Sequence, residues 1–187
     1  MAEIPSEFYD SEQDAPFQHC TMCEVSLTEP PKTYVVEKAM KQYPGKGAQE
    51  LVYEIAICQS CVEKSREAMS DESIQYLMEY MQENGPQIPG FQQGISGESQ
   101  PEDNLDACLF TGTKREQLKE YKIVALLRGN ELPYYSNPYL VSGDVMEDIA
   151  SLLSPKTRDE LNRMRDQILD IPPELEELFS DRDLVFL

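Results

Sequence analysis

The chain has 187 residues, of which 35 are acidic and 16 are basic, so its formal net charge is −19. Such a charge disfavours binding to nucleic-acid phosphates and to anionic membranes, which both require a basic surface. No stretch approaches the roughly 20 apolar residues that span a bilayer, and residues 1–14 lack a hydrophobic signal core. We therefore expect a cytoplasmic protein with no nucleic-acid or membrane partner.

The first ordered part of the chain is predicted over residues 18–84, after an acidic segment over residues 1–17 that we interpret as a flexible tail. Residues 33–39 and 51–58 are rich in β-branched and aromatic side chains. A Pro-Gly-Lys-Gly sequence between them is favourable for a turn. The two stretches therefore predict a β-hairpin with a long loop.

Helical propensity follows the hairpin. Residues 62–69 favour a helix, and Ser70 is a suitable N-cap for a second helix over residues 71–83. Residues 85–106 are rich in Gly, Pro, Gln and Ser and have no periodicity. Because this stretch is too long and too polar for a loop inside a compact domain, it predicts a linker.

A second ordered region is predicted over residues 107–187, so that the expected fold is α+β with two small domains. Ser154, followed directly by a proline, is typical of a helix start. The predicted elements are strands over residues 121–127 and 138–141, helices over 144–153, 154–169 and from 172 onward, and an apolar end over 183–187.

Two Cys-x2-Cys pairs carry the clearest chemistry: Cys20 with Cys23, and Cys58 with Cys61. In a reducing compartment such pairs are more often metal ligands than disulfides. Four thiolates complete the tetrahedral shell of zinc and leave no open position for a substrate, so the pairs predict a structural Zn²⁺ site without catalytic residues. Redox-active pairs and buried free thiols are the alternatives. His19, the only histidine, adjoins Cys20, which makes joint ligation awkward.

The order of these motifs resembles the treble-clef group of zinc fingers over residues 20–69. A cysteine pair, a hairpin and a second cysteine pair at the start of a helix follow one another. The resemblance implies that the second pair lies in the first turn of the helix, where free N–H groups and the helix dipole favour thiolates. The chain departs from this group at Glu24, where a glycine usually follows the second cysteine.

The two ordered regions share one order of elements, which suggests an internal repeat. Cys108 and Thr111 repeat the spacing of the first cysteine pair, and Ser154 repeats Ser70. In this interpretation the second copy is metal-free and Cys108 packs as a small apolar residue. Two unrelated α+β pieces with similar helix starts are the alternative.

The sequence favours a binding or regulatory module over an enzyme. It contains no glycine-rich phosphate loop, and its single histidine leaves little scope for a Ser-His-Asp set. An acidic scaffold held by zinc would suit a basic protein partner. The alternative is that the acidity only keeps the chain soluble. The alternative function is a redox sensor that uses thiols and zinc, or a metal-dependent enzyme.

Overall fold

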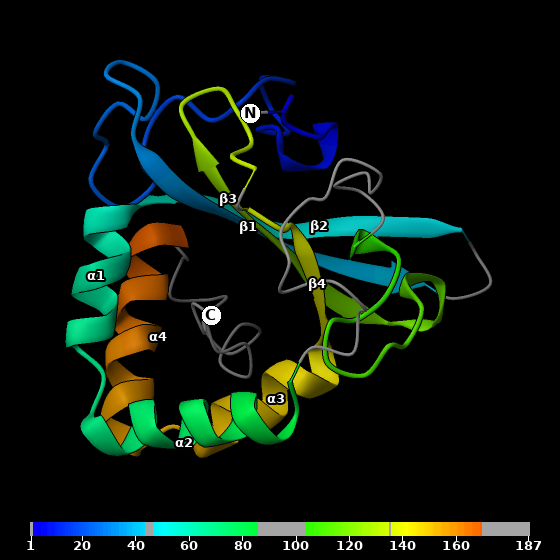
Figure 1. Cartoon of the computed structure of the whole chain (residues 1–187), viewed down its shortest axis with the longest axis vertical. Helices are drawn as coiled ribbons and strands as arrows, with labels where there is room; N and C mark the ends of the chain where they lie inside the picture. Colours follow the sequence, from blue (N-terminus) through cyan, green and yellow to red (C-terminus); the bar gives the residue numbers. More distant parts are fainter. Residues whose placement is uncertain (1, 44–46, 86–103, 135, 170–187) are drawn as a thin grey trace. The chain divides into compact units, whose positions relative to one another are not determined.

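The computed structural model describes residues 2–43, 47–85, 104–134 and 136–169 (Figure 1). These residues belong to two compact units. The first unit takes residues 1–59 and 86–143, and the second takes residues 60–85 and 144–187. Each unit therefore draws on both halves of the chain.

The first unit contains one antiparallel sheet of four strands in the order β2-β1-β3-β4 (Figure 1). All four strands lie where the sequence predicts them, and β1 and β2 extend further toward their shared loop. The combination of this sheet with helices confirms the α+β class. The strands are β1 (Thr33–Tyr43), β2 (Ala48–Cys58), β3 (Glu120–Arg128) and β4 (Tyr139–Ser142), and the unit also has the 3₁₀ turns η1 (Ser6–Phe8) and η4 (Arg115–Gln117).

The register of the first hairpin places the second cysteine pair. Tyr34 in β1 lies opposite Cys58, the last residue of β2, and the ladder continues to a bulge between Ala39 and Met40. Tyr34 and Val36 are fully buried. Burial of these β-branched and aromatic side chains fixes the register, because a slip of one residue would turn them to the opposite face.

The described residues of the amino-terminal segment are packed within the first unit, in contrast to the flexible tail that the acidity of this segment suggests. Ile4, Phe8 and Phe17 are buried, and Ala2 forms a β-bridge with Leu132. Acidic residues between these apolar side chains dominate the composition of the segment, so its composition alone does not reveal that the apolar side chains anchor it. Burying two phenylalanines offsets the entropy lost on ordering the segment.

The described residues of the second unit form helices, and each helix lies within a few residues of its predicted position in the sequence. They are α1 (Gln59–Glu67), α2 (Asp71–Glu83), α3 (Gly143–Leu152) and α4 (Pro155–Leu169), where the first residues of α1 and α3 continue directly from β2 and β4.

Four hydroxyl side chains join the beginnings of α2 and α4. The Ser70 hydroxyl accepts from the Ser73 amide at 3.2 Å, and the Ser154 hydroxyl accepts from the Thr157 amide at 3.3 Å. The two helices also exchange bonds: the Ser70 amide donates to Thr157 Oγ1 and the Ser154 amide donates to Ser73 Oγ, both at 2.9 Å. Each helix start is thus capped by its own serine and by a residue of the other helix.

Three predictions fall wholly or mostly outside the described residues: the short helix from residue 172, the apolar end over residues 183–187 and most of the linker over residues 85–106. The proposed division into domains over residues 18–84 and 107–187 stays a prediction. The strands of both regions nevertheless form a single sheet, through pairing of β1 with β3.

Candidate metal centre

The sulfur atoms of Cys20, Cys23, Cys58 and Cys61 all lie within 4.8 Å of one another. The Sγ atoms of Cys23 and Cys58 are 3.7 Å apart. Tetrahedral zinc with Zn–S bonds of about 2.3 Å holds its sulfur ligands about 3.8 Å apart. None of the four residues forms a disulfide. The predicted convergence of the two pairs is confirmed, and the group could hold a metal ion.

The first pair lies on a tight loop that is bonded to β2. The Cys20 amide donates to the Val25 carbonyl at 2.9 Å, and the Cys20 carbonyl accepts from the Glu24 amide at 2.8 Å. The Thr21 amide donates to the Ala56 carbonyl at 2.8 Å, and the Ala56 amide donates to Thr21 Oγ1 at 2.9 Å. These bonds hold the loop against the end of the strand that carries Cys58.

The second pair spans the junction of β2 and α1. Cys58 ends β2, and Cys61 lies in the first turn of α1, as the treble-clef resemblance implies. The Cys58 amide donates to Cys20 Sγ at 3.3 Å. Amide N–H groups directed at a sulfur stabilise its thiolate form, which is the form that binds a metal.

Burial distinguishes the four thiols. Cys20, Cys58 and Cys61 are buried, whereas Cys23 is exposed. Burial raises the pKa of Cys20, although amide hydrogen bonds from Cys58 and neighbouring residues partly oppose this effect. A bound cation reverses the balance, because coordination deprotonates a thiol. Bringing the thiols together is therefore most favourable when a cation joins them.

Cys108 and His19 lie outside this group. Cys108 is fully buried, with its Sγ 3.5 Å from the hydroxyl of Ser142. Burial raises the pKa of Cys108, but hydrogen bonds from Ser142 and Thr111 outweigh this effect and leave the pKa below its ordinary value. His19 forms a β-bridge with Ser26. Neither residue belongs to the metal-ligating set that the structure brings together.

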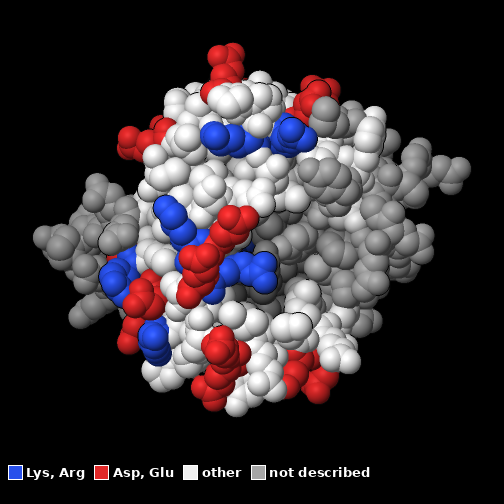
Figure 2. Space-filling view, turned by 60° about the vertical axis from the view of Figure 1, so that its left-hand side comes forward, with Lys and Arg blue, Asp and Glu red and all other residues white. Residues whose placement is uncertain are grey.

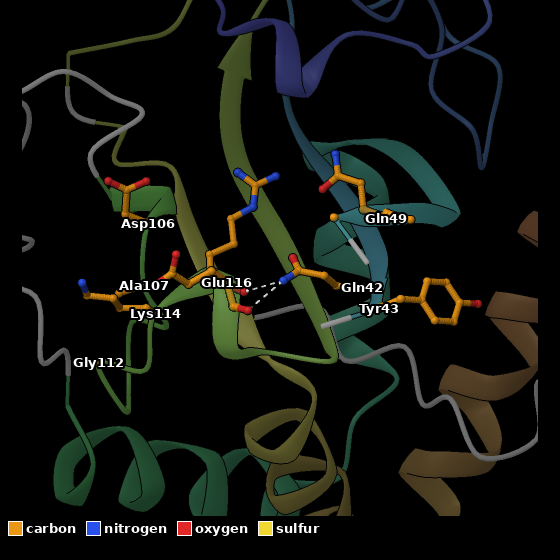
Figure 3. Close-up of a pocket in the computed structure, with 11 residues that line it drawn as sticks. Gln42, Tyr43, Gln49, Asp106, Ala107, Gly112, Lys114 and Glu116 are labelled. Carbon is orange, nitrogen blue, oxygen red and sulfur yellow. Dashed lines mark hydrogen bonds between the residues drawn. The ribbon is translucent and has the colours of Figure 1, made fainter. Parts of the chain in front are cut away.

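A cavity of about 780 Å³ lies between the loop ends of β1 and β2 and the segment around η4 (Figure 3). Gln42 Nε2 donates to the carbonyls of Arg115 and Glu116 at 3.3 and 3.1 Å. Arg115 Nε donates to the hydroxyl of Tyr121, which in turn donates to Gln49 Oε1. Neither cysteine nor histidine is among the described residues that line it. Sequence reasoning missed this cavity because its walls come from distant segments.

No protein-family model matches the chain, and no curated protein or solved structure matches it either. In the part of the chain that the structure describes, no helix is both long enough and apolar enough to cross a membrane. The functional interpretation therefore comes from the chemistry of the four-cysteine group itself.

Proposed function

We propose that Cys20, Cys23, Cys58 and Cys61 bind one zinc ion with a structural role. The observation that carries the proposal is the convergence of four Sγ atoms within 4.8 Å. Soft thiolate ligands in tetrahedral arrangement suit zinc, with an iron–sulfur cluster as the other common occupant. Four protein ligands leave no position for a substrate, which argues against a catalytic metal.

The expected effect of zinc is to stabilise the contact between the first cysteine loop and the junction of β2 with α1. Metal binding to such a site contributes directly to the free energy of folding. The order of loop, hairpin and helix supports a treble-clef-like arrangement over residues 20–69. We also place the protein in the cytosol, because reducing conditions keep paired thiols available for zinc.

Metal analysis of the purified full-length chain tests this proposal. We expect close to one zinc per chain, and a thiolate-to-cobalt absorption band after replacement by Co²⁺. Cys58→Ser should lose most of the metal, whereas the control Cys108→Ser should retain it. A folded wild-type chain that takes up no zinc would contradict the proposal, and bound iron would assign the cysteines to a cluster.

We propose further that the exposed face of α2 binds a basic protein segment that carries apolar side chains. Met78 is 67% exposed, and Met81 and Tyr76 are also exposed. The helix contains four acidic residues and no basic one. A hollow of about 620 Å³ is lined by Ile74 and Met78 together with carboxylates and glutamines. Flexible methionines surrounded by acidic groups suit an amphipathic basic helix.

The side chains of α2, and not the net charge of the chain, define the proposed docking surface. On the face seen in Figure 2, basic side chains lie among the acidic ones. Excess acidity alone therefore does not define a docking surface. The proposal relies on the combination of exposed apolar side chains and carboxylates on one helix.

A synthetic amphipathic helix of lysine and leucine is a suitable probe for α2. We expect it to bind the wild-type chain with an affinity that falls as salt rises. Met78→Asp should weaken binding about tenfold, because it places a charge in the apolar contact. The matched control is Tyr134→Asp, since Tyr134 is 64% exposed and lies outside α2. Equal loss in both variants would reject α2 as the site.

Redox sensing by the same cysteines is the second candidate function, and the exposure of Cys23 favours it. An oxidant could reach this thiolate while its three partners stay buried. A sensing site should release zinc in mild hydrogen peroxide and recover it after reduction. A site with a structural role alone should keep its zinc under the same conditions.

We also infer that the two ordered regions of the sequence, over residues 18–84 and 107–187, are diverged copies of one ancestral segment. The order β2-β1-β3-β4 is the one that two hairpins produce when they join through their first strands. The last residues of β2 and β4 lie opposite Tyr34 and Tyr121, respectively. Three positions after these tyrosines, Glu37 and Val124 pair with each other. Equivalent positions thus meet at the centre of the sheet, as an approximate two-fold axis requires.

A further inference from the structure

We infer that Cys108, Thr111, Ser142 and Val145 occupy the ligand positions of a second metal site, in which only Cys108 has kept its thiol. The inference rests on the proposed zinc site and on the proposed repeat. It adds Ser142 and Val145, the two positions that the cysteine spacing did not indicate.

The loop around Cys108 has the same hydrogen bonds as the first cysteine loop. The Cys108 amide donates to the Thr113 carbonyl, and its carbonyl accepts from the Gly112 amide, both at 2.8 Å. The corresponding distances at Cys20 are 2.9 and 2.8 Å. Gly112 has a φ of 67° and Glu24 has a φ of 58°, so both loops turn through a left-handed residue at the same position.

Both loops attach to the sheet in the same way. The Ser142 amide donates to Cys108 Sγ at 3.4 Å, and the Cys58 amide donates to Cys20 Sγ at 3.3 Å. Ser142 ends β4 as Cys58 ends β2. A further backbone bond of 2.8 Å ties each loop to its strand, from Thr21 to Ala56 in the first copy and from Leu109 to Leu140 in the second.

The contacts assign Ser142, and the positions of Thr111 and Val145 along the chain assign the other two ligand positions. Thr111 follows Cys108 at the spacing of the first cysteine pair. Ser142 takes the place of Cys58, and Val145 is the third residue of α3 as Cys61 is the third residue of α1.

The present side chains explain why the second copy needs no metal. One thiol, two hydroxyls and one valine do not form a zinc shell. Instead, the Cys108 thiol and the Ser142 hydroxyl lie 3.5 Å apart, within hydrogen-bonding distance for sulfur. Hydrogen bonding and packing thus hold together a loop that coordination would hold in the first copy.

Restoring the ligands tests the inference in the full-length chain. The variant Thr111→Cys/Ser142→Cys/Val145→Cys should bind one more Co²⁺ than the wild type, with about a doubled thiolate-to-cobalt absorption band. The matched control is Thr113→Cys/Val141→Cys/Ser151→Cys, which changes the same residue types at positions equivalent to Val25, Ile57 and Glu67. It should bind no more cobalt than the wild type.

The double variant Thr111→Cys/Ser142→Cys keeps Val145 and guards against misfolding of the triple variant. Its three thiols should still bind an additional cobalt ion, with lower affinity than four thiols. The inference fails if neither variant gains cobalt, if neither folds when cobalt is present, or if the control gains as much. A wild type that binds no cobalt would reject the proposed zinc site together with this inference, whereas a wild type that binds one ion beside variants that gain none would reject this inference alone.

Discussion

At the residue scale, the backbone of Glu24 shows where the first cysteine loop is strained. Its φ of 58° lies in the left-handed region, which costs a residue with a Cβ about 1–2 kcal/mol. The matching residue of the second loop is Gly112, with a φ of 67°. The glycine that the treble-clef resemblance implies at this position is thus found in the second loop, which has one cysteine instead of two.

Glu24→Gly should therefore stabilise the zinc-loaded chain by about 1 kcal/mol, because glycine adopts this conformation without steric cost. Urea unfolding followed by circular dichroism measures the change. Gly112→Ala is the converse control and should destabilise by a similar amount, since only backbone strain opposes a Cβ in the open space there. A loss of stability in Glu24→Gly would show that the glutamate side chain matters more than its strain.

Glu54 shows how the amino-terminal segment is tied to β2. Its carboxylate lies 2.8 Å from Lys38 Nζ and accepts from the amide and hydroxyl of Ser11, while Lys38 also donates to the carbonyl of Tyr9. Burial raises the pKa of Glu54, but the bonds from Lys38 and Ser11 outweigh it and bring the pKa below the ordinary value of 4.5.

A lowered carboxylate pKa predicts how stability depends on pH. The contribution of Glu54 is present above the ordinary pKa and disappears as pH falls through the lowered one. Glu54→Gln should thus cost about 1–3 kcal/mol at pH 7 and flatten the loss of stability below about pH 4.5. Urea unfolding from pH 7 to pH 3 measures both effects. The exposed control Glu3→Gln should change neither the stability at pH 7 nor its loss at low pH. Identical pH profiles for Glu54→Gln and wild type would show that the Glu54 carboxylate does not stabilise the fold.

At the element scale, the sequence predicts those features that depend on residues a few positions apart in the chain. Ser70 and Ser154 were recognisable as helix caps because a cap bonds an amide only three residues away. The cysteine pairs were recognisable because their spacing fits a turn and a helix start. The anchoring of Phe8 and the cavity beside Gln42 could not be predicted, since their partners lie far along the chain. The same limit applied to the joining of β1 with β3.

The beginnings of α2 and α4 stabilise each other, because each supplies a hydroxyl that accepts from an amide of the other. Ser73→Ala or Thr157→Ala should each cost about 1–2 kcal/mol, because each leaves an amide of the other helix without its acceptor. Thermal unfolding followed at 222 nm measures this. The double variant should cost less than the sum, since the two hydroxyls also bond each other at 3.1 Å.

Ser151→Ala is the control for the cap variants. Its hydroxyl donates to the Asp148 carbonyl within α3, and the residue is exposed, so its removal should change stability by less than about 0.5 kcal/mol. Strict additivity of the Ser73 and Thr157 variants would mean that the two helix starts are independent.

At the scale of the whole molecule, the sheet joins the two halves of the chain. β1 pairs with β2 from its own half and with β3 from the other half. A division of the sequence at residues 85–106 therefore does not divide the sheet. The two halves depend on each other for the hydrogen bonds of their central strands.

Limited proteolysis tests this dependence. The composition of residues 85–106 predicts that a protease cuts there first. The two fragments should nevertheless stay together on size-exclusion chromatography, because the pairing of β1 with β3 remains intact. Fragments that separate without denaturant would show that each half is a domain in its own right.

The central pairing also has a consequence for biosynthesis. During translation, β1 and β2 leave the ribosome well before β3, so one edge of β1 stays without its permanent neighbour. An open strand edge is a template for pairing with other nascent chains. The risk that β1 pairs with another chain therefore lasts until the residues of β3, up to Arg128, have emerged from the ribosome.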